Sequence, residues 1–151
     1  MQEPRELDIA QCDALLRAHT VGRVAFSTPT GPYVIPVNYA VLEDSIVVRT
    51  TAYSLLGTHA HTTTPLAFEI DDIDHEHERG WSVLARGPGK VVEDYAEMAR
   101  IREEAPSAPW ASGTRALFVR LRWNELTGRQ LGRDWDPLAE PAERRDDGAR
   151  R

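Results

Sequence analysis

The sequence has one cysteine, one lysine and no long apolar run. With Cys12 alone, no intrachain disulfide and no cysteine-rich zinc site can form. No apolar stretch approaches the roughly 20 residues of a membrane-spanning helix. The opening residues Met1-Gln2-Glu3-Pro4 have no apolar core, so we predict no signal peptide. These absences favour a cytoplasmic protein.

An excess of acidic charge limits the kinds of partner. The 151 residues include 24 Asp and Glu against 18 Lys and Arg, which gives a net charge of -6. The chain therefore has no electrostatic reason to bind nucleic acid or an anionic membrane, and we predict neither partner. Basic residues do gather late in the chain, where they could meet a phosphate, although solvated strand edges explain them better: Arg115, Arg120, Arg122, Arg129 and Arg133.

The length is that of one domain. We place this domain at residues 1–132. From Arg133 onward the composition turns to Arg, Asp, Glu, Pro and Ala, which predicts a disordered tail over residues 133–151.

The apolar pattern within the domain predicts a mainly β fold with a few short helices. Alternating or apolar segments bounded by turn residues indicate strands at 21–27, 33–41, 46–50, 65–71, 80–87, 114–121 and 126–131, with 89–93 as a further strand or an extension. Residues 53–61 are typical of a short helix or turn, and 71–79 of a loop. Six to eight antiparallel strands favour a closed barrel with Greek-key-like connections, because closure removes exposed edges.

Two capped helices are predicted beside these strands. Asp8 is expected to cap the first, with Gln11 completing a capping box, and Asp94 the second, which ends near Glu104, with Glu97 in the same role. The apolar stripe of the first helix comprises Leu7, Ile9, Cys12, Leu15 and Leu16. The core contacts of the second are Met98 and Ile101.

Two segments carry residue types that can hold a ligand with a flat ring and a phosphate. Pro36 and Val37 offer a rigid apolar wall for a flat ring, and the Asn38 side chain both donates and accepts hydrogen bonds. Arg49 can fork onto a phosphate, with hydroxyls of Thr50 and Thr51 beside it. The alternatives are that Pro36 marks a bulge or an edge, that Asn38 bonds its own backbone, and that Arg49 lies in solvent.

Other candidate sites are weaker. His75 and His77 flank Glu76, but their spacing matches no known ligand pattern, so we predict no metal site. Trp81 and Trp110 are placed near a ligand cleft, or in ordinary core packing. No nucleophile elbow or phosphate-binding glycine loop is present, so the catalytic residues stay unknown and hydrolase chemistry has no support.

A set of short motifs resembles the pyridoxamine 5'-phosphate oxidase-like family, close to its actinobacterial branch near the nitroimidazole-resistance-like proteins. The motifs are Val21-Gly22-Arg23-Val24-Ala25-Phe26, Pro36-Val37-Asn38-Tyr39, Arg49-Thr50-Thr51, Ala67-Phe68-Glu69-Ile70-Asp71, Gly80-Trp81-Ser82-Val83 and Thr127-Gly128-Arg129. The resemblance covers residues 7–131. It implies a split β-barrel, a homodimer, a small-molecule substrate, and FMN bound in clefts between the two subunits.

The resemblance also assigns cofactor contacts residue by residue. They are Pro36, Val37 and Asn38 along the isoalloxazine ring, Arg49, Thr50 and Thr51 near the ribityl chain and phosphate, Ser54 on the phosphate, and Trp81 and Ser82 near the ring or the facing subunit.

One position departs from the family pattern. Relatives commonly carry a lysine after the Arg-Thr strand, where this chain has Leu55. A charge-assisted contact to a phosphate is about twice as strong as a neutral hydrogen bond, so its loss should weaken FMN binding. We therefore keep three hypotheses: an FMN-dependent oxidoreductase, a reductase that uses the deazaflavin F420, and a non-enzymatic barrel with a weakened phosphate site.

Overall fold

The computed structural model describes residues 3–105, 116–132 and 134–140 of the chain. The strands are β1 (Arg5–Leu7), β2 (Val21–Thr28), β3 (Gly31–Leu42), β4 (Ser45–Thr51), β5 (Thr64–Asp74), β6 (Arg79–Val91), β7 (Ala116–Arg122) and β8 (Glu125–Leu131). The helices are α1 (Ile9–Ala18), α2 (Leu55–His59) and α3 (Tyr95–Glu104). The predicted mainly β class is confirmed.

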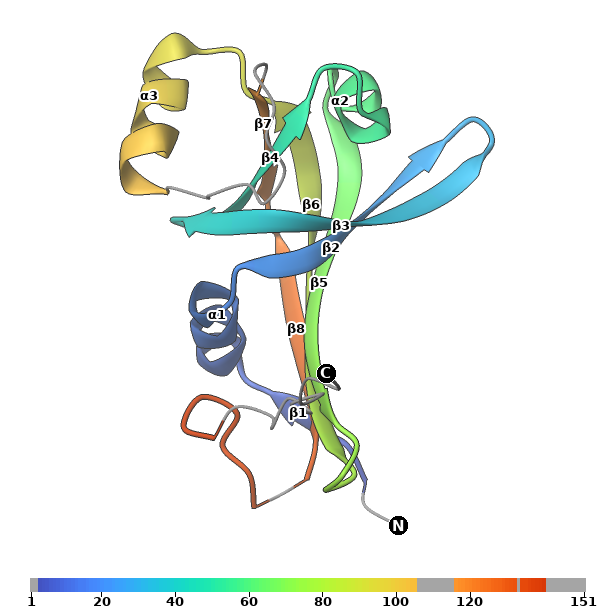
Figure 1. The fold of residues 1–151 in the computed structure, drawn as a ribbon, viewed down its shortest axis with the longest axis vertical. Coiled ribbons are helices and arrows are strands. Elements are labelled where there is room, and N and C mark those ends of the chain that lie inside the picture. The colour runs from blue at the N-terminus through green and yellow to red at the C-terminus, as the bar shows by residue number, and fades with distance from the viewer. Residues whose placement is uncertain (1–2, 106–115, 133, 141–151) are drawn as a thin grey trace, which may run out of the picture.

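Six of the strands close into an antiparallel barrel (Figure 1). Their order is β6-β5-β2-β3-β4-β7, and β6 pairs with β7 to close the ring, while β8 and β1 extend the sheet from the other half of β6. Within this ring β5-β2-β3-β4 is a Greek key, because three consecutive strands are followed by a fourth that returns beside the first. The predicted barrel and its connections are therefore confirmed.

The acidic segment predicted as a loop at 71–79 is largely strand, and that prediction is wrong. Asp71 pairs with Ser82, and the ladder continues to Asp74 opposite Arg79, so only residues 75–78 turn the chain. The Asp74 side chain, 2% exposed, accepts hydrogen bonds from Arg79 Nε at 2.9 Å and from the backbone N–H of His77 at 3.1 Å. These bonds allow a carboxylate to be buried at the strand end.

Helix α1 packs on the barrel beside β8. Asp8 and Gln11 form the predicted capping box, and the side chains of Cys12, Leu15 and Leu16 are buried. Ile9 is 70% exposed, so its predicted place in the apolar stripe is wrong. The buried hydroxyl of Tyr39 donates to the carbonyl of Leu16 at 2.6 Å, which fixes the end of the helix against β3.

Helix α3 covers a second, smaller apolar cluster. Ile101 is buried there with Val47 and Phe118, and Met98 packs against the cluster, as predicted. Asp94 caps the helix by accepting from the backbone N–H of Ala96. Glu97 does not complete the predicted capping box, because its carboxylate accepts from Arg120 at 2.8 Å instead.

Residues 134–140 fold against the far end of the barrel. Trp135 is 3% exposed and belongs to the main core. Its indole Nε1 donates to the Glu140 carbonyl at 2.6 Å, and the Arg79 guanidinium lies 4.6 Å from its ring centroid. The domain that the sequence places at 1–132 thus takes in Trp135. Residues 133 and 141–151 of the predicted tail lie outside the described residues.

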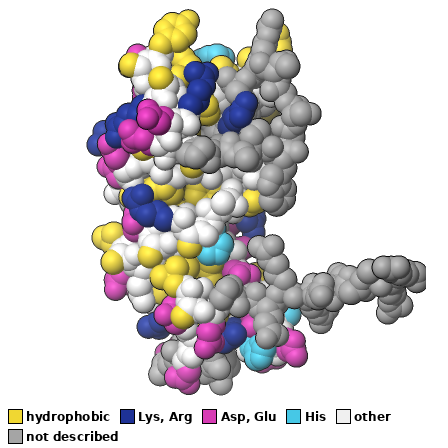
Figure 2. Space-filling model, turned by 60° about the vertical axis from the view of Figure 1, so that its left-hand side comes forward, with side chains coloured by type: hydrophobic (Ala, Val, Ile, Leu, Met, Phe, Trp, Pro, Cys, Tyr) yellow, Lys and Arg dark blue, Asp and Glu magenta, His cyan; other side chains and the backbone are white. Residues whose placement is uncertain are grey.

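The surface mixes charges of both signs. On the face in Figure 2, Lys and Arg side chains lie beside Asp and Glu. Among the described residues, Arg100 and Arg120 pair with Glu43, and Arg122 Nε lies 3.3 Å from Asp44. Two of the late arginines are therefore neutralised within the chain. No helix in the described part of the chain has the length and apolar character needed to cross a membrane.

Candidate functional site

The two segments singled out in the sequence lie next to each other where the sheet divides. The ladder between β3 and β4 runs from Leu42 opposite Ser45 to Tyr39 opposite Val48. Beyond that pair β3 continues along β2, and β4 continues along β7. Asn38 and Arg49 are therefore the first residues beyond the last pair of this ladder, and we call this place, where the two strands take different neighbours, the opening.

The strand alternation decides which side chains of β3 can reach a ligand at the opening. Pro36 pairs with Arg23 and is exposed, whereas Val37 pairs with Gly22 and packs against the main core. Because successive side chains point to opposite faces, Asn38 shares the outer face with Pro36. The Val37 side chain faces inward, which leaves its backbone for the predicted ring contact. Pro36 lies where β3 pairs with β2 alone, which agrees with the predicted edge.

Arg49 is the cation nearest to this opening along β4. It lies on the same face as Phe118, its partner on β7, and it makes no hydrogen bond or ion pair with residues 3–105, 116–132 or 134–140. A half-buried guanidinium without a carboxylate partner is available to an anionic ligand. This is the property that a phosphate site requires.

A tight turn joins β4 to α2, and within it the Ser54 hydroxyl makes all the hydrogen bonds that it can make. That hydroxyl accepts from Thr50 Oγ1 at 2.7 Å and from the Gly57 backbone N–H at 2.9 Å, and it donates to the Thr51 carbonyl at 2.8 Å. A Cβ on Gly57 would lie 2.3 Å from the Thr51 carbonyl, so the turn requires glycine there. The predicted phosphate role of Ser54 stays a prediction, and it requires an exchange of one of these bonds.

Leu55 opens helix α2 directly after this turn. Its side chain is 39% exposed, so a lysine at this position would keep its ammonium group in water beside the opening. The nearest basic side chain on the helix is His59, whose Nδ1 is bonded to the Leu55 carbonyl at 2.9 Å. The turn therefore brings no charge of its own to a phosphate, and Arg49 is left as the basic group at this end of β4.

Trp81 and Ser82 lie on opposite faces of β6. Trp81 is 3% exposed inside the barrel, where its ring meets His19 edge-on at 4.9 Å, and its buried Nε1 has no hydrogen-bond partner among the described residues. Ser82 faces outward opposite Asp71. Two strands, β5 and β2, separate Ser82 from β3, a distance of about 14 Å at the usual strand spacing. Within one chain, Ser82 and Asn38 cannot touch the same atom of a ligand.

An ionic cluster that the sequence did not single out lies between them. Arg23 Nη2 is 2.7 Å from Asp71, and Arg23 Nη1 is 3.6 Å from Glu69. Burial and the neighbouring Asp71 raise the pKa of Glu69 to about 7, although Arg23 opposes the shift. The signal was present in the alternation of Glu69 and Asp71, which places both carboxylates on one face of β5.

Comparison with known proteins places the chain in a family. A family model described as "Pyridoxamine 5'-phosphate oxidase" matches residues 8–130. The uncharacterized protein Rv0080 of Mycobacterium tuberculosis is 27% identical over 137 residues, which cover 88% of this chain and 89% of the relative.

Solved structures agree with the fold. The FAD binding protein from Mycobacterium smegmatis matches with a TM-score of 0.68 and 28% identity, over 83% of this chain and 98% of that one. The conserved protein DIP1874 from Corynebacterium diphtheriae, of unknown function, matches with a TM-score of 0.70 and 27% identity, over 85% and 98%.

Proposed function

Because the chain belongs to the pyridoxamine 5'-phosphate oxidase family, we propose that it is an FMN-binding oxidoreductase that holds its flavin at the opening between β3 and β4, bordered by a second copy of the chain. The observation that carries this proposal is the position of Asn38 and Arg49. They flank the point where the two strands separate, and Arg49 has no partner in the described chain. A phosphate and a planar ring would be held by opposite sides of the same opening.

Each part of the flavin has a matching group in this arrangement. Pro36 supplies a rigid wall on the outer face of β3, and Asn38 supplies a donor and an acceptor for the polar edge of the ring. Arg49 supplies the positive charge for the phosphate, and the exposed Thr51 adds a hydroxyl. The flavin itself would supply hydride or electron transfer to a small-molecule substrate, while the protein binds and orients it.

A relative supports the choice of a flavin. The Mycobacterium smegmatis protein that is 28% identical is described as an FAD binding protein. FAD and FMN share the isoalloxazine ring and the ribityl phosphate. An opening that binds this shared part in one cofactor offers it the same contacts in the other. FMN is proposed here because the described residues at the opening offer one free guanidinium, Arg49, which matches one terminal phosphate.

Leu55 supports a second candidate, a reductase that uses the deazaflavin F420. The family lysine is replaced by a neutral side chain at the helix start, and this weakens the site for a terminal phosphate dianion in particular. F420 carries its phosphate within a diester, which bears one negative charge. The absence of the lysine should therefore reduce the affinity for F420 less than the affinity for FMN.

Spectroscopic titration separates these candidates. The full-length protein is titrated with FMN, FAD and F420, and binding is followed by flavin fluorescence and by changes in the visible bands. We expect saturable FMN binding at micromolar concentration and weaker F420 binding. Tighter F420 binding would favour the second candidate. Absence of saturable binding for all three would overturn the proposal. Binding without reduction of the bound flavin by NADH or NADPH would favour a non-enzymatic barrel.

A further inference from the structure

The outer face of the sheet leads from the flavin opening to a cluster of charged side chains. The strand registers place Pro36 of β3 beside Arg23 of β2, and Arg23 beside Glu69 of β5. Alternation along β5 puts Asp71 on the same face as Glu69. The side chains of Arg23, Glu69 and Asp71 are 41%, 31% and 28% exposed. All three are therefore open to a molecule that binds on this face.

The spacing of the strands brings this cluster within reach of the flavin site. Side chains that pair across neighbouring strands have their Cβ atoms about 5 Å apart, so Arg23 lies directly beside Pro36. Glu69 lies two strands from Pro36, a distance of about 10 Å. The three fused rings of a flavin are wider than one strand spacing. A substrate that lies on a flavin packed against Pro36 and extends toward β5 therefore meets Arg23 first and Glu69 next.

The two carboxyls of the cluster share one guanidinium unequally. Asp71 accepts a hydrogen bond from Arg23 Nη2 at 2.7 Å, whereas the Glu69 carboxylate lies 3.6 Å from Arg23 Nη1, beyond hydrogen-bonding distance. One guanidinium neutralises one carboxylate, and Asp71 has the closer contact. Glu69 is therefore the carboxyl that keeps a proton. Burial and the neighbouring Asp71 raise its pKa to about 7, although Arg23 opposes the shift.

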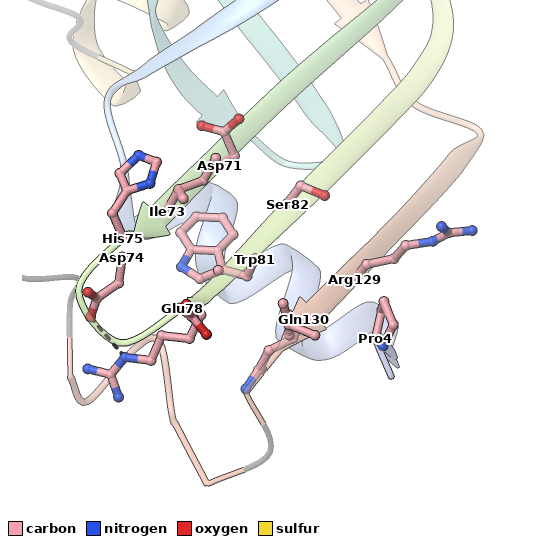
Figure 3. Close-up of a pocket in the computed structure, with 13 residues that line it drawn as sticks. Pro4, Asp71, Ile73, Asp74, His75, Glu78, Trp81, Ser82, Arg129 and Gln130 are labelled. Carbon is pink, nitrogen blue, oxygen red and sulfur yellow. Dashed lines mark hydrogen bonds and ion pairs between the residues drawn. The ribbon is translucent and has the colours of Figure 1, made fainter. Parts of the chain in front are cut away.

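The strands beyond β5 bring no second cation to the two carboxyls. The residues that pair with them on β6 are Leu84 and Ser82, and both are uncharged. Arg86, farther along β6, has its Nη1 3.0 Å from a carboxylate of β8. Figure 3 shows Asp71 on β5 and Arg129 on β8, with β6 between them. Within the part of the chain that the structure describes, the pair thus depends on the guanidinium of β2 alone.

We propose that Glu69 is the proton donor of the flavin site, with Asp71 and Arg23 as the residues that position it. The inference rests on the proposed function, because it requires a flavin against Pro36. A quinone-like substrate that takes a hydride from the reduced flavin becomes an oxyanion, and Arg23 stabilises that charge. The O–H bond of Glu69 then breaks and a new O–H bond forms on the substrate oxygen. Glu69 is left as a carboxylate and regains a proton from water.

A purely structural role explains the cluster less well. The ion pair between Arg23 and Asp71 is complete without a second carboxyl, and a carboxylate beside it adds repulsion between like charges. A neutral β-branched residue at position 69 would pair with Leu84 without that cost. A carboxyl that gains and loses its proton near neutral pH is, by contrast, what general acid catalysis requires.

Two electron acceptors test the inference on the FMN-loaded protein. The quinone menadione needs a proton for each hydride that it takes, whereas ferricyanide takes electrons alone. The bound flavin is reduced with stoichiometric dithionite, and its reoxidation by each acceptor is followed in a stopped-flow instrument. In Glu69→Gln the ratio of the menadione rate to the ferricyanide rate should fall at least tenfold at pH 7. Glu103→Gln, the same change on an exposed glutamate of α3, should keep the wild-type ratio.

Binding of FMN gives a second readout that does not depend on turnover. Reduced FMN carries an additional negative charge, which should make Glu69 hold its proton more tightly. The affinity for reduced FMN relative to oxidised FMN should therefore fall severalfold from pH 6 to pH 8. Glu69→Gln should flatten this change. The titration of free FMN itself is the same for both proteins, so the difference between them isolates Glu69.

The outcomes separate this inference from the proposed function. Failure of the wild type to reduce menadione, an unchanged rate ratio in Glu69→Gln, or the same pH dependence of FMN affinity in both proteins would each overturn the role of Glu69, while FMN binding still stands. Absence of FMN binding by the wild type would reject the proposed function, and this inference with it. Circular dichroism checks that each variant is folded.

Discussion

Asn38 on β3 and Arg49 on β4 are the first residues beyond the last pair of the β3–β4 ladder, Tyr39 and Val48. From this point on, β3 pairs with β2 alone and β4 pairs with β7 alone, although both strands remain in the same barrel. A polar amide and a guanidinium with no partner among the described residues thus flank the end of the β3–β4 ladder. This placement is the basis of the following two predictions.

Replacing Arg49 should weaken FMN binding while leaving the fold intact. Arg49→Ala removes a charge-assisted contact, of the kind worth about 1.5–3 kcal/mol, so the Kd for FMN should rise at least tenfold. Arg49→Lys keeps the positive charge, so the Kd for FMN should rise less than in Arg49→Ala. Arg122→Ala is the matched control, since that arginine is exposed on β7 and bound to Asp44. Fluorescence titration measures the three constants, and an unchanged Kd for Arg49→Ala would place the phosphate elsewhere.

Restoring the family lysine should strengthen FMN binding. Leu55 is 39% exposed at the start of α2, so Leu55→Lys fits without disturbing the core. We expect the Kd for FMN to fall about tenfold, near 1.4 kcal/mol, because the ammonium group is added beside a phosphate. Leu55→Gln, of similar length and without charge, is the control. No gain for Leu55→Lys over Leu55→Gln would show that the phosphate does not lie at this end of β4.

Much of the fold could be predicted because local rules and tertiary structure agree. The Asp8–Gln11 capping box and the first three long strands follow from short-range patterns, and the structure confirms them. Both strands of the β5–β6 hairpin were predicted, but its end beyond Asp71 was missed because an acidic segment is typical of a loop. Its strand character comes from pairing with β6, and Asp74 becomes buried through Arg79, which is a contact outside the range of local propensity.

The site could be predicted in part. Strand alternation was available from the sequence, and it separates Val37 from Pro36 and Trp81 from Ser82. The three hydrogen bonds of the Ser54 hydroxyl could not be predicted from the sequence, because they depend on how closely Gly57 approaches the Thr51 carbonyl. Glu97 was assigned to a helix cap from its spacing alone, but Arg120 lies on a distant strand and competes for the same carboxylate. Trp110 lies outside the described residues.

Removing the Trp135 side chain should destabilise the barrel although the residue follows the last strand. The indole is 3% exposed in the main core, its Nε1 donates to Glu140, and Arg79 lies against its ring. Trp135→Ala should lower the free energy of unfolding by about 3–5 kcal/mol. Urea denaturation followed by circular dichroism measures the loss. Leu138→Ala is the control, because Leu138 is 47% exposed in the same segment and should change stability by less than about 1 kcal/mol. Equal effects of the two substitutions would contradict the structural role of Trp135.

Unfolding should become easier as the pH rises through neutrality. Burial and the neighbouring Asp71 raise the pKa of Glu69 to about 7 from an ordinary value of 4.5, although Arg23 opposes the shift. Between these two values the folded chain binds more protons at Glu69 than the unfolded chain does, so the contribution of Glu69 to the free energy of unfolding should fall from pH 5 to pH 8. Glu69→Gln removes the titrating group and should flatten this part of the pH dependence, which urea denaturation at both pH values can measure. A difference in stability between the wild type and Glu69→Gln that is the same at pH 5 and pH 8 would contradict the raised pKa of Glu69.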